Sequence, residues 1–91
     1  MTNLPSYARK YIGLVDRANP YGVSPEVGSL IIFFPALGGL IGPCAYAKDL
    51  EDAHARARDV LITYAESLDD PEAWAADIKL LNLHTHKELT V

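Results

Sequence analysis

The longest uncharged stretch of the chain, residues 27–47, sets the strongest limit on its fold. Its sequence, VGSLIIFFPALGGLIGPCAYA, is long enough to cross a bilayer as a helix. However, Pro35, Pro43 and the paired glycines Gly38 and Gly39 cut it into pieces of strand length. A membrane helix would lose internal backbone hydrogen bonds at each break. We therefore expect strands and turns here, and a small membrane protein spanning residues 27–47 is the less favoured alternative.

Three short apolar runs predict the strands of a small sheet. They alternate in part or are continuously apolar, and Pro and Gly bound them, which is typical of strands joined by turns. The expected strands are residues 9–16, 30–34 and 44–48, with turns at 19–22, 38–39 and 42–43. Residues 1–8 are expected to form a loosely held arm. The pattern predicts an antiparallel sheet of about three to four strands.

Residues 50–68, LEDAHARARDVLITYAESL, carry the clearest helical pattern. Asp49 is placed to cap the first turn, and Asp52 follows three residues later in the position of a capping-box acid. Apolar residues recur at spacings of three and four, so one face of this main helix should pack on the sheet. The expected buried residues are Leu50, Ala53, Ala57, Val60, Leu61, Tyr64 and Leu68. Together these elements predict an α+β fold.

Two interpretations compete for the segment after the main helix. Residues 70–72, DPE, have the cap, the proline and the first-turn acid of a helix start, so a second short helix is expected over residues 71–81. The alternative makes residues 78–83 a strand, and the apolar pattern does not separate the two. Residues 84–91 are expected to form a weak edge strand or a frayed end.

Composition favours one small cytoplasmic domain, residues 1–91. Eight basic and twelve acidic residues give a formal net charge of −4. This balance disfavours direct nucleic-acid binding and favours a basic protein partner. The single cysteine, Cys44, excludes an internal disulfide, and the N-terminal sequence MTNLPSYARK has no apolar signal core. Because so small a domain is only marginally stable, a second copy of the chain is also a candidate partner.

The pattern of reactive residues favours a protein that is not an enzyme and holds no cofactor or metal. His84 and His86 would share one face of a strand, but zinc takes three or four ligands and no further ligand stands at a telling spacing. Cys44 has no activating base beside it and is interpreted as a small buried residue. The enzymatic alternative is a metal-dependent nuclease that uses Asp16, Asp52 and the histidines. Helix capping explains Asp52 better.

Two groups of residues are candidates for contacting a partner. Leu37, Leu40 and Ile41 lie in the apolar, turn-rich segment PALGGLIGP, which either fills the core or forms a partner-binding lip. Glu51 and Asp59 lie on the predicted outer face of the main helix, where acidic side chains would speed the encounter with a basic partner.

The order of these features resembles the N-terminal domain of HicB-like antitoxins. The resemblance rests on FFPALGG followed by PCAYAKDLEDAHARARDVLITYAESL, covers residues 30–68, and adds YIGLVDR as a first strand. It implies a partial RNase H-like fold without nuclease activity. The residues after 68 do not resemble the DNA-binding domain that such antitoxins carry, so we expect the module without that domain.

The resemblance also implies a function. The chain would be the antitoxin of a toxin–antitoxin system, a non-enzymatic inhibitor that binds and occludes a small basic toxin ribonuclease or a similar nucleic-acid-handling protein. The alternative is a phage-type, anti-CRISPR-like inhibitor of a host defence complex. The sequence leaves the partner and the biological system open.

Overall fold

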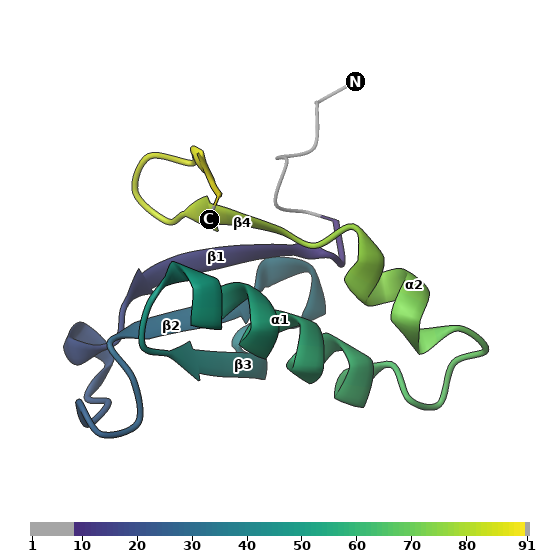
Figure 1. Cartoon of the computed structure of the whole chain (residues 1–91), viewed down its shortest axis with the longest axis horizontal. Coiled ribbons are helices and arrows are strands. Elements are labelled where there is room, and N and C mark those ends of the chain that lie inside the picture. The colour runs from purple at the N-terminus through teal and green to yellow at the C-terminus, as the bar shows by residue number, and fades with distance from the viewer. Residues whose placement is uncertain (1–8, 91) are drawn as a thin grey trace.

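Short apolar segments pair into a five-stranded sheet with a helix on one face (Figure 1). The computed structural model describes residues 9–90, so the arm expected over residues 1–8 lies outside the described residues. The strands are β1 (Ile12–Arg17), β2 (Leu30–Phe34), β3 (Gly39–Ala47), β4 (Lys79–Asn82) and β5 (Glu88–Leu89). Their order in the sheet is β3-β2-β1-β4-β5. The predicted α+β class is confirmed.

The sheet is mixed, whereas the sequence predicted an antiparallel one. β2 pairs antiparallel with β1 and β3, and β5 pairs antiparallel with β4, but β1 and β4 run parallel. The reason is the helical segment between β3 and β4, because a helical crossover carries the chain back to the end of the sheet at which β3 began, so β4 runs parallel to β3 and to β1. Local apolar patterns in the sequence do not reveal this direction.

The helix α1 (Leu50–Tyr64) packs on one face of the sheet and supplies the main core. As predicted, Asp49 caps it, because its Oδ1 accepts a hydrogen bond from the backbone N–H of Asp52 at 2.8 Å. The main core joins three helix residues to residues of four strands: Val15, Ile32, Phe34, Ala45, Ala47, Ala53, Ala57, Leu61 and Leu80. A second apolar cluster, Ile12, Leu14, Phe33 and Leu81, lies on the opposite face of the sheet.

The helix α1 ends four residues before the predicted end at Leu68. Tyr64 and Leu68, which were expected to be buried, are 50% and 42% exposed. The ring of Tyr64 instead lies 6.2 Å from the ring of Trp74 in the second helix, α2 (Pro71–Ala76). Leu68 follows the last buried residue of this segment, Ala65, and is followed by polar residues that favour a turn over a further helical turn.

Both interpretations of the segment after α1 are partly confirmed. A short α2 begins where predicted, with Asp70 Oδ1 accepting from the backbone N–H of Ala73 at 3.3 Å, but it ends at Ala76. The strand β4 follows at once. Leu80 joins the main core and Leu81 the cluster on the opposite face, an alternation that a strand produces and a helix does not. The tail forms the predicted edge strand, two residues long, as β5.

The uncharged residues 27–47 form two strands joined by the single-turn 3₁₀ helix η3 (Pro35–Leu37), as expected, and no continuous helix. The strand β3 starts earlier than predicted and includes Gly42 and Pro43, which were expected to form a turn. Its register with β2 shifts at this point, because Phe33 pairs with Cys44 while Phe34 pairs with Gly39. Residues 40–43 therefore bulge out of the ladder. Within residues 9–90 no helix is long and apolar enough to cross a membrane.

Candidate functional site

We call the apolar segment from the end of η3 to the middle of β3 the apolar lip; its residues are Leu37, Leu40 and Ile41. Ile41 is 96% exposed and Leu40 52% exposed, whereas Leu37 packs against the main core. A Cβ atom on Gly42 would collide with the carbonyl oxygen of Leu37, so only glycine allows the chain to fold back this closely. The two interpretations of the segment thus divide between its residues: Leu37 fills the core, and Leu40 and Ile41 are presented to solvent.

The outer face of α1 carries both signs of charge. Glu51 and Asp59 are exposed there, as predicted, but so are Arg56 and Arg58. Arg56 forms an ion pair with Asp52, one helical turn earlier, with its Nε 3.3 Å from Asp52 Oδ1. Glu51 and Asp59 therefore belong to a mixed surface, which attracts a basic partner less than a purely acidic one would.

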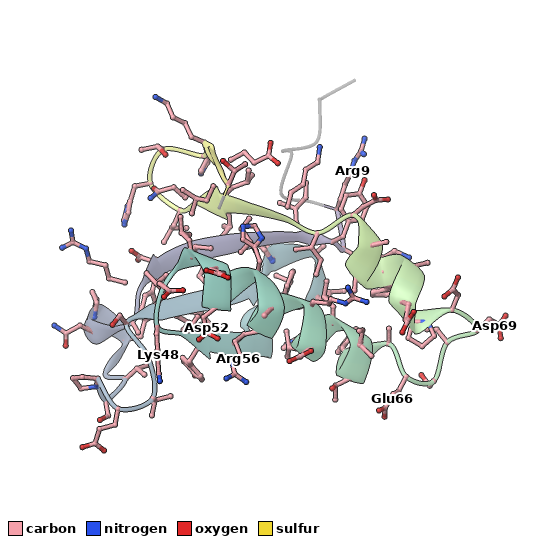
Figure 2. The ribbon with its side chains drawn as sticks, viewed as in Figure 1. Arg9, Lys48, Asp52, Arg56, Glu66 and Asp69 are labelled. Atoms are coloured by element: carbon pink, nitrogen blue, oxygen red, sulfur yellow. The ribbon has the colours of Figure 1, made fainter. Side chains whose placement is uncertain are left out.

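Negative charge gathers instead from the second half of α1 to the start of β4. Residues 59–78 contain six acidic and no basic residues, while the remainder of the chain contains six acidic and eight basic ones. All six carboxylate side chains are exposed; we call them the acidic end: Asp59, Glu66, Asp69, Asp70, Glu72 and Asp77. Figure 2 shows Glu66 and Asp69 at the outer margin of the molecule, beyond the sheet. The total charge conceals this asymmetry, and a count along the sequence would have found it.

The apolar lip and the acidic end lie toward the same end of the sheet. Only Lys48 and Asp49 separate β3 from α1, and α1 packs against β3. The helix must therefore run back along the strand, so its C-terminal half lies over the end of the sheet at which β3 begins (Figure 1). Basic residues also lie at this end of the sheet: Lys10 Nζ is 3.9 Å from the centroid of the Trp74 ring, and Lys79 begins β4 two residues after Asp77.

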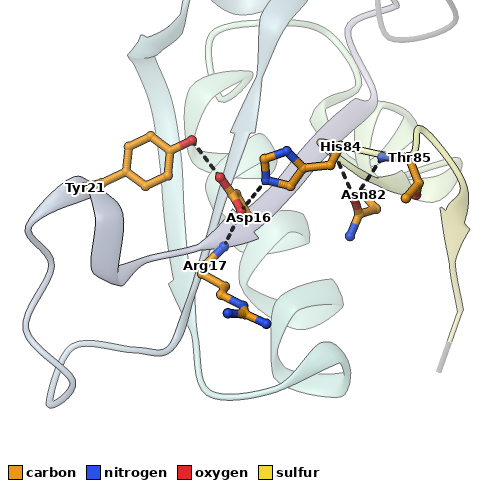
Figure 3. A network of polar contacts seen from close by, with 6 residues as sticks. All are labelled: Asp16, Arg17, Tyr21, Asn82, His84 and Thr85. Atoms are coloured by element: carbon orange, nitrogen blue, oxygen red, sulfur yellow. Dashed lines mark hydrogen bonds and ion pairs between the residues drawn. The ribbon is translucent and has the colours of Figure 1, made fainter.

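A separate polar cluster lies at the carboxyl ends of the parallel strands β1 and β4 (Figure 3). The side chain of Asp16 is 12% exposed, and its Oδ1 lies 3.1 Å from His84 Nε2. The same Oδ1 accepts from the backbone N–H of Arg17 at 2.7 Å, and Oδ2 accepts from the Tyr21 hydroxyl at 3.0 Å. This cluster joins three segments that are distant in the sequence.

The hydrogen bonds at Asp16 decide its charge. Burial alone would raise the pKa of Asp16, but the hydrogen bonds from Arg17, Tyr21 and His84 favour the charged form more, and the pKa lies below its ordinary value. A charged carboxylate only accepts, so Nε2 of His84 must carry the hydrogen and donate. Burial and then the hydrogen bond to Asp16 raise the pKa of Tyr21 above its ordinary value.

Local sequence explains how these side chains meet. The predicted turn at 19–22 forms a 3₁₀ turn, η2 (Asn19–Tyr21), and ends at Gly22 with φ 76°. On the other side, Asn82 Oδ1 accepts from the backbone N–H of His84 at 2.8 Å and of Thr85 at 3.0 Å, which turns the chain back toward β1. The expectation that His84 and His86 share the face of a strand is wrong, since both precede β5 and His86 has φ 57°.

A cleft of about 750 Å³ opens beside this cluster, with apolar walls from Val15, Leu30, Leu50 and Leu89. The cluster offers one oriented imidazole ring. Asp52, which the nuclease alternative requires, accepts from the backbone N–H of Lys48 at 3.1 Å instead. Among residues 9–90, His, Cys, Asp and Glu form no group of three or more that is arranged to hold a metal.

Cys44 is half-buried beneath the apolar lip. Its Sγ lies 3.7, 3.6 and 3.5 Å from the carbonyl oxygens of Gly39, Leu40 and Gly42. Burial raises the pKa of the thiol above its ordinary value, so the neutral form dominates at neutral pH. Cys44 was predicted to be a small buried residue, and the structure buries it only in part.

No protein-family model matches the chain, and no curated protein and no solved structure match it either.

Proposed function

We propose that the chain is a non-enzymatic inhibitor of the antitoxin type, which binds and neutralises a small basic nucleic-acid-handling protein, a toxin ribonuclease in the first place. The observation that carries this proposal is the acidic end, six exposed carboxylates without an intervening basic residue, toward the same end of the sheet as the apolar lip. The cytoplasmic location belongs to the same proposal.

The two surfaces have complementary physical roles. A protein that binds nucleic acid presents Lys and Arg to the phosphates. A row of carboxylates can occupy the same groups and can speed the encounter by electrostatic attraction. Exposed ion pairs contribute little affinity by themselves, so apolar contacts must hold the complex together. Leu40 and Ile41 are among the most exposed large apolar side chains of residues 9–90, which suits them to that role.

The strand arrangement is compatible with the partial RNase H-like fold that the HicB-like resemblance implies. An antiparallel run of β1, β2 and β3 is followed by α1, and β4 returns parallel to β1. A phage-type inhibitor of a host defence complex would use the same acidic end and the same lip. The identity of the recovered partner distinguishes the two: a small toxin supports the first, and a subunit of a defence complex supports the second.

One observation favours a second, enzymatic candidate. The contact between Asp16 and His84 leaves Nδ1 of a neutral imidazole available as a general base next to a cleft. A nuclease would also need groups that stabilise the developing charge. The test is RNA cleavage by the purified protein with and without Mg²⁺: cleavage that His84→Ala abolishes would establish the enzyme, and no cleavage above the His84→Ala background favours the inhibitor.

Affinity capture from a native lysate, followed by mass spectrometry, tests the inhibitor proposal. The bait with Glu66→Lys and Glu72→Lys should recover less of the basic partner than the wild type. The bait with Glu26→Lys and Glu88→Lys is the matched control, because it changes the net charge equally at exposed positions outside the acidic end. Equal loss of the partner from both baits would show that only total charge matters and would refute the acidic end as the contact.

A further inference from the structure

One edge of the sheet lacks the usual protection against pairing. β3 forms this edge, and among residues 9–90 no strand lies on its outer side. Exposed edges are normally very short or carry charged side chains, which prevent another strand from adding. β5, at the opposite edge, is two residues long and contains Glu88, whereas β3 is nine residues long and contains no charge. β3 is therefore the edge that is open to a further strand.

The second half of β3 provides the straight part of this edge. Residues 40–43 bulge out of the ladder, and Pro43 has no N–H to donate. From Cys44 to Ala47 the register with β2 is regular, residue by residue. Tyr46, within this segment, is 39% exposed. An added strand would thus pair with residues 44–47.

The charges beside this edge indicate what the added strand is. α1 packs against β3, so anything that pairs with β3 also meets the flank of α1. Along that margin Figure 2 shows Lys48, Asp52 and Arg56, which are spaced by four and alternate in sign. A strand with charges of one sign would meet repulsion as well as attraction there. Asp52 and Arg56 carry opposite charges one helical turn apart, so an antiparallel copy whose twofold axis passes midway between them places each residue opposite a charge of the other sign.

The charges on the flank of the helix decide where the two copies would match. Ala45 and Ala47 belong to the same core cluster as Ala53 and Ala57, and α1 packs against β3. A twofold axis through residues 44–47 that passes beside residue 54, midway between Asp52 and Arg56, sets Asp52 of each copy opposite Arg56 of the other. The acidic end begins at Asp59, in the C-terminal half of α1, and its other five residues follow the end of the helix.

We propose that two copies of the chain associate through residues 44–47 of β3, antiparallel about a twofold axis, with Asp52 and Arg56 of the two copies paired across it. The result is one continuous sheet through both copies, with the two α1 helices side by side on the same face. This association is independent of the proposed inhibitor function, because it uses a different part of α1 and needs no partner.

Size-exclusion chromatography with light scattering tests the proposal. The chain has a mass of 10.0 kDa, so the wild type should elute with twice that mass. Arg56→Asp places like charges across the axis and should raise the dissociation constant at least tenfold, as should Asp52→Arg. An equimolar mixture of the two variants restores opposite charges and should recover the dimer. Arg17→Asp, the same charge change at the end of β1, should leave the dimer intact.

Circular dichroism of each variant shows whether it is folded, because Asp52 also accepts from the backbone N–H of Lys48. If Asp52→Arg unfolds, the comparison of Arg56→Asp with Arg17→Asp decides alone. A wild type of monomeric mass at all concentrations up to the millimolar range would overturn the proposal. So would an Arg56→Asp variant that dimerises as well as Arg17→Asp, or a mixture of folded charge-reversed variants that stays monomeric.

Discussion

Replacing Leu61 by alanine should remove a large share of the stability of the domain. Leu61 is fully buried between α1 and the sheet, in the cluster that contains Phe34 and Leu80. The lost transfer free energy, at about 0.8 kcal/mol per buried CH₂, comes to about 2.4 kcal/mol. The cavity left behind brings the total into the range of about 2–5 kcal/mol. A domain of this size has a free energy of unfolding of roughly 5–14 kcal/mol, so the loss is a large share of the total.

Urea denaturation followed by circular dichroism measures this loss, as a lower midpoint with an unchanged slope. In a thermal scan the midpoint should fall by roughly 10–40 °C. Leu68→Ala is the matched control, since the same atoms are removed from a side chain that is 42% exposed. It should cost less than about 1 kcal/mol. Equal losses for the two variants would refute the packing of α1 described here.

Three further predictions concern single positions. Asp16→Asn should lower the free energy of unfolding most at neutral pH. Because the pKa of Asp16 is lowered in the folded state, the stabilisation by its carboxylate is complete above the ordinary value of 3.8 and is lost as the pH falls through the folded-state pKa. Urea denaturation curves of the wild type and the variant should therefore converge in acid. Gly42→Ala should destabilise the fold by about 1–3 kcal/mol in the same assay, because the added methyl group collides with the Leu37 carbonyl. Cys44, whose pKa is raised by burial, should react with iodoacetamide at pH 7 more slowly in the folded protein than in urea, and equal rates would contradict its position.

The elements of the fold were largely predictable because local patterns specify them. The cap at Asp49, the continuous apolar run of β2 and the proline start of α2 each follow from a few adjacent residues. The ends of elements were less predictable. Tyr64 and Leu68 continue the helical spacing of α1, but burial depends on where the sheet lies, and the spacing does not contain that information.

The candidate sites depended on tertiary structure to different degrees. The apolar lip was predictable as a segment, because its glycines and its lack of charge are local features. The division between partly buried Leu37 and exposed Ile41 depends on the register shift in β3. The contact of Asp16 with His84 spans 68 positions and follows from the parallel pairing of β1 and β4, for which the sequence carries no local signal.

The salt dependence of partner binding tests the central claim most directly. The dissociation constant of the captured partner is measured between about 50 and 500 mM salt, for the wild type and for the chain with Glu66→Lys and Glu72→Lys. Screening weakens exposed charge pairs over this range, because the Debye length falls below ~10 Å. We predict that salt weakens binding of the wild type steeply, and that the variant binds less tightly and responds less to salt. Equal affinities of the two proteins at every salt concentration would contradict the proposal that the acidic end contacts a basic partner.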